Sequence, residues 1–411
     1  MNQDQLSKVG AGRGFFAALD QSGGSTPKAL AEYGIARDQY SSDAEMFDLV
    51  HAMRTRVVTS PAFDGSRVLA AILFEQTMDR DVDGMPTAQY LWERKTVVPF
   101  LKVDKGLAAE QDGVQLMKPI DILDELLDRA HQHQIFGTKM RSVINDASEA
   151  GVTAIVDQQF DYAAQIMAAG LIPILEPEVS IASPHKGHAE ALLRDALHKH
   201  IEALPADATI LLKLTIPTEV GLYAGIASDP RVLRVLALSG GYSRDEACAL
   251  LARDPSLIAS FSRALLAGLT ASQTDEQFNA QLDASITQIF EASVVKQPGP
   301  ARRRPGGARP VPEAGPPGLA RVTSWAHQHA PDGYPQPLHG RAVARPAEHL
   351  PDPGAIQHRP FDVAGPLPGA AVRCGRPGRV ARLEVAAGQR RHRLRGHVGL
   401  RPGRLAGWRG G

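Results

Sequence analysis

One lysine lies within an otherwise apolar run, Leu211-Leu212-Lys213-Leu214-Thr215. A charged side chain in a buried strand is costly unless it is paired or used in chemistry. Burial and nearby positive charge favour the neutral amine, and enzymes that form Schiff bases prepare their nucleophile in this way. The alternative is a charged lysine neutralised by Glu176 or Glu178, and the sequence alone leaves both interpretations open.

Further charged residues stand at the ends of neighbouring apolar runs, several of them two positions apart. Residues two apart on a strand point to the same side, and catalytic groups of parallel barrels lie at the carboxyl ends of strands. We therefore expect these side chains to meet around one barrel mouth. Glu176 and Glu178 would then divide acid and base roles, or merely balance the cations. The set comprises Asp20, Lys102, Asp104, Lys139, Arg141, Glu176 and Glu178.

Two Gly-Ser stretches are candidate anion sites. Ser22-Gly23-Gly24-Ser25 follows Asp20, and Ser239-Gly240-Gly241 follows another apolar run, with Arg263 at the end of the next. Backbone N–H groups in such loops and at the following helix start favour phosphate, especially after the seventh and eighth barrel strands. Each stretch alone is more often a turn. Together they predict a substrate with two phosphates.

Eight short apolar runs predict the strands that would position these residues. Such near-continuous runs are typical of parallel strands covered on both faces. They lie at Gly14–Asp20, Val68–Phe74, Val97–Asp104, Ile135–Arg141, Leu171–Glu178, Thr209–Thr215, Val232–Ser239 and Leu257–Arg263.

Helix-start signals separate these runs. They are a Thr26 cap followed by Pro27 at the first helical position, and the capping-box pairs Ser42/Glu45, Ser243/Glu246 and Thr274/Gln277. Strands alternating with helices over this length predict an α/β fold, a (β/α)8 TIM barrel over residues 1–296. An open doubly wound sheet is the rival.

The composition changes after Lys296. Residues 297–411 hold 19 arginines, six acidic residues and no lysine, so the net charge of zero for the whole chain hides about −13 in residues 1–296. A segment rich in Arg, Pro and Gly cannot bury enough apolar area to offset its ordering entropy, so we expect a disordered extension. A frameshift or read-through product is the preferred interpretation. The alternative is an Arg-rich arm that binds RNA or acts as a scaffold.

Several classes of site are not indicated. No nucleotide-binding glycine motif is present, the histidines lack metal-ligand spacing, and no apolar run is long enough to span a membrane. The polar start lacks a signal peptide, and two distant cysteines fit a reducing compartment, so we expect a cytoplasmic protein without nucleic-acid or membrane partners. Whether it forms a homo-oligomer stays open.

A family resemblance extends in order from about Gln5 to Ser293. It rests on the stretches GFFAALDQSGGSTPKAL, FLKVDKG, GTKMRSVI, ILEPEV, LLKLTIP, ALSGGYSRDEA and SFSRAL, which closely resemble bacterial class I fructose-bisphosphate aldolases. One departure is Ser180, where an acidic residue is expected. The resemblance implies a metal-independent, cofactor-free lyase that reversibly cleaves fructose 1,6-bisphosphate to dihydroxyacetone phosphate and glyceraldehyde 3-phosphate, in glycolysis and gluconeogenesis.

The same resemblance implies the role of each site residue. Lys213 matches the Schiff-base lysine, Glu176 the proton-transfer glutamate, and Glu178 its neighbour. Asp20 matches the aspartate near the C4 hydroxyl. The remaining matches are the basic pair Lys139 and Arg141, the C1-phosphate site of Ser239, Gly240 and Arg263, and the C6-phosphate side of Ser25 and Lys102. A Schiff-base lyase or transaldolase acting on a singly phosphorylated sugar is the nearest rival.

Overall fold

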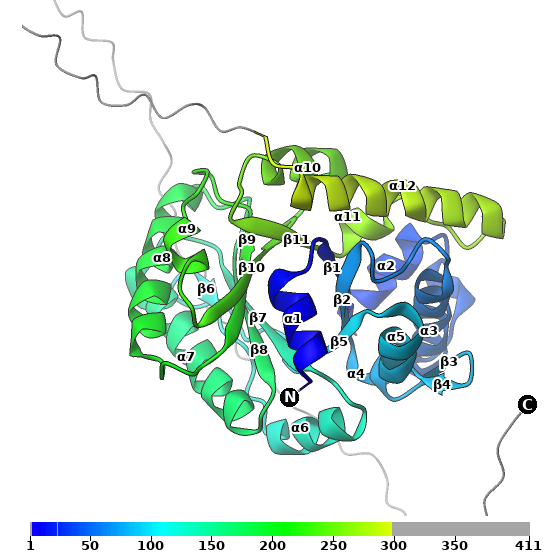
Figure 1. Cartoon of the computed structure of the whole chain (residues 1–411), viewed down its shortest axis with the longest axis horizontal. Coiled ribbons are helices and arrows are strands. Elements are labelled where there is room, and N and C mark those ends of the chain that lie inside the picture. The colour runs from blue at the N-terminus through cyan, green and yellow to red at the C-terminus, as the bar shows by residue number, and fades with distance from the viewer. Residues whose placement is uncertain (1, 23, 298–411) are drawn as a thin grey trace, which may run out of the picture. The chain divides into compact units, whose positions relative to one another are not determined.

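A computed structural model describes residues 2–22 and 24–297, in which eight parallel strands close into a barrel (Figure 1). Each strand pairs with the next in the order below, and β11 pairs with β1 to close the circle. The (β/α)8 prediction is confirmed, and the open sheet is excluded because the barrel has no edge. The strands are β1 (Phe15–Leu19), β2 (Val68–Leu73), β5 (Val98–Lys102), β7 (Gly137–Ile144), β8 (Ile172–Val179), β9 (Ile210–Thr215), β10 (Val232–Leu238) and β11 (Leu257–Phe261).

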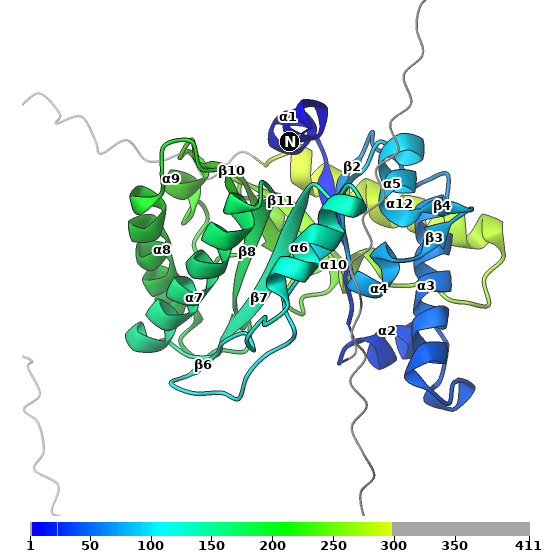
Figure 2. The ribbon, with the colours of Figure 1, turned by 90° about the horizontal axis from the view of Figure 1, so that it is seen from below.

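Helices cover the outside of this barrel and one of its ends. Figure 2 shows α1 (Gln3–Ala11) at one end and α2 (Thr26–Glu32) at the opposite end, beyond the carboxyl end of β1. A two-stranded hairpin, β3 (Asp81–Val82) with β4 (Met85–Pro86), and β6 (Val114–Gln115), antiparallel to β7, complete the sheets. The other helices are α3 (Asp43–Thr59), α4 (Glu75–Met78), α5 (Thr87–Lys95), α6 (Leu123–Gln132), α7 (Glu149–Ala168), α8 (Lys186–Ala203), α9 (Ala224–Ala227), α10 (Arg244–Leu251), α11 (Arg263–Leu266) and α12 (Asp275–Val294), with a 3-10 turn at Arg37–Gln39.

Three of the predicted helix caps are confirmed. The side chains of Ser42, Ser243 and Thr274 each accept a hydrogen bond from the backbone N–H three residues ahead, and the Thr274 box is closed by Gln277. The predicted boxes at Ser42 and Ser243 are not closed by their glutamates; the Glu45 carboxylate accepts from the backbone N–H and hydroxyl of Ser41 instead.

The cap predicted at Thr26 was wrong by one residue. Ser25 is the cap of α2, so Thr26 is the first helical residue and Pro27 the second. The Thr26 hydroxyl donates to the Ser22 carbonyl at 2.9 Å, which ties the first turn of α2 to the loop after β1. This hydrogen bond fixes the start of α2 next to Ser22.

The interior of the barrel has an apolar layer beneath a polar one. Phe16 and Phe100 pack against each other with ring centroids 5.6 Å apart and ring planes tilted by 43°, and Ile174 and Leu211 belong to the same cluster. Because alternate residues of a strand face the same side, the residues two positions further on face the lumen at its carboxyl end. For Leu211 that residue is Lys213.

The described part of the chain ends on a well-anchored segment. The Lys296 ammonium donates to the carbonyls of Leu251, Leu257 and Ala292 at 3.1, 2.7 and 2.9 Å, and the Gln297 N–H donates to Ala252 at 2.9 Å. The predicted disordered extension, residues 297–411, lies outside the described residues except for Gln297. Within the described ranges, no helix combines the length and apolar character needed to cross a membrane.

Candidate active site

A cavity of about 410 Å³ opens at the carboxyl end of the barrel. Loops after β1, β5, β10 and β11 form its wall, and β7, β8 and β9 supply its floor. All but one of the predicted site residues line it. They are Asp20, Ser25, Lys102, Lys139, Arg141, Glu176, Glu178, Lys213, Ser239, Gly240 and Arg263.

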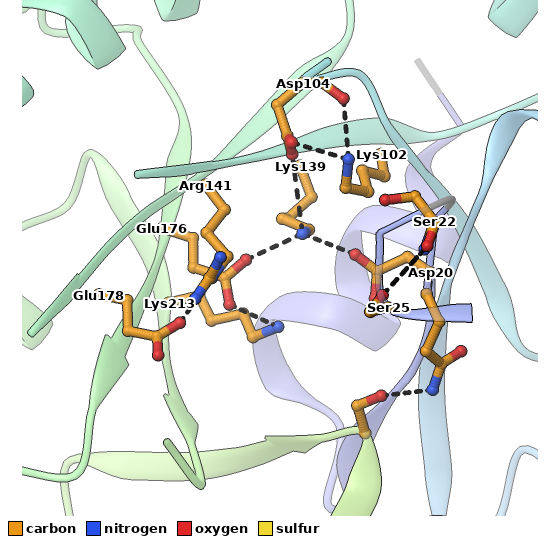
Figure 3. A network of polar contacts seen from close by, with 12 residues as sticks. Asp20, Ser22, Ser25, Lys102, Asp104, Lys139, Arg141, Glu176, Glu178 and Lys213 are labelled. Carbon is orange, nitrogen blue, oxygen red and sulfur yellow. Dashed lines mark hydrogen bonds and ion pairs between the residues drawn. The ribbon is translucent and has the colours of Figure 1, made fainter. Parts of the chain in front are cut away.

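Lys213 and Lys139 share one carboxylate at the floor of this cavity. Glu176 Oε1 lies 2.8 Å from Lys213 Nζ, and its Oε2 lies 3.0 Å from Lys139 Nζ. Lys139 also approaches Asp20 Oδ2 at 2.6 Å, so the four side chains form a continuous chain (Figure 3). Lys213 is only 5% exposed, and its ion pair with Glu176 matches the alternative that the sequence left open.

Two further ion pairs lie beside these four linked side chains. Lys102 Nζ lies 2.7 Å from Asp104 Oδ1, and Asp104 Oδ2 lies 3.9 Å from Lys139 Nζ. Arg141 Nε donates to Glu178 Oε2 at 2.6 Å. Glu178 therefore pairs with Arg141, while Glu176 is the carboxylate that Lys213 contacts, so the two glutamates of the Glu-Pro-Glu stretch have different partners.

The charges of the pairs shift their protonation equilibria. Burial raises the pKa of Asp20 and of Glu176, but the charges of Lys139 and Lys213 outweigh it, so both pKa values lie below their usual range. Burial likewise opposes the charged form of Lys139, yet the carboxylates of Asp20, Glu176 and Asp104 raise its pKa. At neutral pH Asp20 and Glu176 are carboxylates and Lys139 is an ammonium ion.

The candidate anion site after β10 depends on a glycine. Gly240 has φ +60°, in the left-handed region, and a Cβ there would lie 2.8 Å from the Ile181 side chain. Ser239 is buried beside it, and Arg263 begins α11 on the neighbouring strand end. Gly241 does not line this cavity but an adjacent one of about 420 Å³, which Ser239 and Arg263 also line, so its place in the anion site stays a prediction.

Several residues that line the cavity were not predicted from the sequence. Gln21, Ser260 and Ser262 line the cavity, as does Lys28 from α2. Ser260 and Ser262 stand two apart at the end of β11, so the spacing rule applied to charged residues would have found them had hydroxyls been included. Gln21 carries no such signal, because a single amide after a strand is ordinary.

Acid should remove the contribution of Asp20 to stability. Because its folded pKa is lowered, that contribution is present above the unfolded pKa of about 4 and is lost as pH falls below it. We expect Asp20→Asn to cost about 2 kcal/mol at pH 7, less than a fully broken buried pair because Lys139 keeps Glu176. Urea unfolding at pH 7, 5, 4 and 3 should show this difference shrinking. Asp283→Asn, at an exposed pair with Arg67, is the matched control and should change little. A cost for Asp20→Asn that is constant with pH would contradict the assignment.

A buried lysine beside carboxylates at the carboxyl mouth of a (β/α)8 barrel is the arrangement of a barrel enzyme. Comparison with known proteins identifies which family of such enzymes it is. The family model described as "Fructose-bisphosphate aldolase class-I" matches residues 5–218. The class 1 fructose-bisphosphate aldolase of Synechocystis is 60% identical over 293 residues, 71% of this chain and 98% of the relative. The chain belongs to the class I fructose-bisphosphate aldolases, a family of lyases.

A solved structure shares the fold at lower identity. Fructose-bisphosphate aldolase from Plasmodium falciparum superposes with a TM-score of 0.56 at 20% identity, over 72% of this chain and 94% of that one. This likeness concerns the barrel alone. Among residues 2–22 and 24–297, no cluster of three or more His, Cys, Asp or Glu side chains could hold a metal ion.

Proposed function

We propose that Lys213 forms the Schiff base through which this aldolase reversibly cleaves fructose 1,6-bisphosphate to dihydroxyacetone phosphate and glyceraldehyde 3-phosphate. The observation that carries the proposal is the buried Lys213 amine, 2.8 Å from Glu176. The same cavity is lined by candidate hydrogen-bond donors to phosphate. Family membership supports the reaction, and the geometry supports the choice of lysine.

The first stage forms the covalent intermediate. The Lys213 ammonium gives up a proton, for which Glu176 is the adjacent acceptor, and the neutral amine attacks the C2 ketone. Glu176 then returns a proton to the C2 hydroxyl of the carbinolamine, and water leaves to give an iminium ion. Lys139, paired with both Glu176 and Asp20, holds the two carboxylates in place during these transfers.

The second stage breaks the carbon–carbon bond. Asp20 or Glu176 removes the C4 hydroxyl proton, the C3–C4 bond breaks, and its electron pair moves into the iminium to give an enamine. Glyceraldehyde 3-phosphate leaves, the enamine is protonated at C3, and hydrolysis of the resulting iminium releases dihydroxyacetone phosphate. The iminium supplies the electron sink, so this scheme requires no metal or cofactor.

Phosphate binding completes the proposal. Ser239, Gly240 and Arg263 would hold the C1 phosphate, and Ser25 and Lys102 the C6 phosphate, with Arg141 lining the same cavity. Within the described residues, Arg263 forms no ion pair, whereas Lys102 and Arg141 are already paired with Asp104 and Glu178. A phosphate would therefore meet an available cation at Arg263 and compete for the others.

Borohydride trapping tests the assignment directly. Reduction in the presence of dihydroxyacetone phosphate should add one three-carbon phosphate to Lys213, located by peptide mass spectrometry, and EDTA should not reduce activity. Trapping elsewhere, or no trapping together with EDTA sensitivity, would reject it. Unchanged affinity for the bisphosphate in Ser25→Ala would favour a lyase acting on a singly phosphorylated sugar.

We also propose that the enzyme ends at about residue 296 and acts in the cytoplasm without a nucleic-acid partner. The relative from Synechocystis aligns over a length close to that of the barrel. A chain ending at Gln297 keeps the contacts of Lys296 and Gln297 and should retain full aldolase activity. Activity lost on truncation would contradict the boundary, and salt-sensitive RNA binding lost with it would favour the RNA-binding alternative.

A further inference from the structure

A buried arginine lies behind the cavity wall without a carboxylate partner. Arg54 projects from α3 and is 1% exposed, and it forms no ion pair with any residue that the structure describes. Its NH1 donates to the Thr77 hydroxyl at 2.6 Å, and its NH2 donates to the Gln21 carbonyl at 2.5 Å and to Gln21 Oε1 at 3.2 Å. Burying an unpaired guanidinium is expensive, so a structural role alone is a weak explanation.

Arg54 determines the orientation of the Gln21 side chain. A guanidinium has only donors, so the amide oxygen of Gln21 must face Arg54 and the amide nitrogen must face away from it. That nitrogen donates to the Ser262 hydroxyl oxygen at 2.6 Å. The direction of every hydrogen bond from Arg54 to Ser262 therefore follows from the chemistry of the guanidinium.

The Ser262 hydroxyl is left with one proton to give. Its oxygen already accepts from Gln21, so its hydrogen points to another acceptor. Both Gln21 and Ser262 line the cavity, and Ser262 directly precedes Arg263 at the N-cap position of α11, where its side chain forms no capping hydrogen bond. The cavity side of Ser262 is therefore a donor, suited to an anionic oxygen.

We infer that Arg54 is a positioning residue for substrate phosphate, acting through Gln21 to present the Ser262 hydroxyl as a hydrogen-bond donor beside Arg263. The inference rests on the proposed function for the identity of the anion, the C1 phosphate. Burial lowers the pKa of Arg54 to about 10, although the Asp20 carboxylate raises it, so the guanidinium remains charged at neutral pH. Its charge adds to the positive potential at the same wall.

The test compares single and double variants. Ser262→Ala, Gln21→Met and Arg54→Lys should each raise the half-saturating concentration of dihydroxyacetone phosphate for borohydride trapping, by about tenfold for Ser262→Ala and about fivefold for the others. The kcat should change less than about threefold. Ser262→Thr keeps a hydroxyl and should restore most of the affinity.

The double variant separates positioning from general packing. If Arg54 acts through the Ser262 hydroxyl, Arg54→Lys should cost less than about twofold in affinity once Ser262 is Ala. Additive losses would overturn the inference, as would a fall in kcat with unchanged affinity. Arg234→Lys, at a largely buried arginine that donates to the Val9 and Gly12 carbonyls under the opposite end of the barrel, is the matched control. It should leave the affinity unchanged.

Two safeguards keep the outcomes distinct. Gln21→Met tests the same link if Arg54→Lys does not fold, which circular dichroism would reveal. Calorimetric binding of inorganic phosphate to the same variants reports on the donor without any covalent chemistry. A wild-type protein that binds phosphate but traps no adduct would reject the proposed function, whereas trapping and phosphate binding unaffected by all three substitutions would reject only the inference about Arg54.

Discussion

Replacing Lys213 with methionine should lower kcat/KM by at least about 10⁴-fold and abolish borohydride trapping. Methionine fills a similar volume, and Glu176 keeps its ion pair with Lys139, so the barrel should remain folded. Neither Lys139 nor Lys102 should take over, because Lys139 is held as an ammonium ion by three carboxylates and Lys102 is bound to Asp104. Steady-state kinetics with near-ultraviolet circular dichroism would measure both effects.

Lys213→Arg is the control for charge. Arginine preserves the positive charge beside Glu176 but cannot form a Schiff base at neutral pH. An equally large loss would show that the amine acts as a nucleophile, and recovery of more than about 1% of wild-type activity would show that the charge alone matters. Residual trapping in Lys213→Met would show that another lysine is the nucleophile.

Replacing Lys139 with methionine should damage both stability and catalysis. The change would leave the carboxylates of Asp20, Glu176 and Asp104 in one buried region without the cation between them, at a cost of about 3–5 kcal/mol. We expect kcat to fall by about 10²–10³-fold, because the two carboxylates proposed for proton transfer lose their common anchor and are pushed toward protonation. Urea unfolding and steady-state kinetics at pH 7 would measure the two losses.

The pH dependence of this loss identifies its cause. In Lys139→Met the clustered carboxylates are relieved of repulsion when they take up protons, so the stability difference from wild type should shrink as pH falls from 7 to 4. Lys102→Met is the comparison for stability, since Lys102 contacts one carboxylate rather than three, and it should cost less. A loss in Lys139→Met that does not vary with pH would indicate a packing defect instead.

The apolar runs determined the eight strands to within two or three residues at each end. A buried parallel strand must be apolar on both faces, so the length of the apolar run indicates the length of the strand. The polar residues at strand ends, such as Lys213 and Glu176, were placed on one mouth by the two-residue period. The helix starts at Ser42, Ser243 and Thr274 were equally local, because a cap uses a hydroxyl and a backbone N–H three residues apart.

Only the tertiary structure decided which charges pair. Arg141 lies opposite Glu176 in the register of β7 and β8, yet it binds Glu178, and Glu176 turns toward Lys213 on β9. Such choices depend on the stagger between strands and on rotamers in a crowded lumen, which no spacing along one strand encodes. Arg54 illustrates the same limit, since nothing in α3 indicates that its side chain would cross to the loop after β1. Lys213 was thus recognisable from its strand alone, whereas the choice of Glu176 rather than Glu178 as its partner was decided only by the tertiary structure.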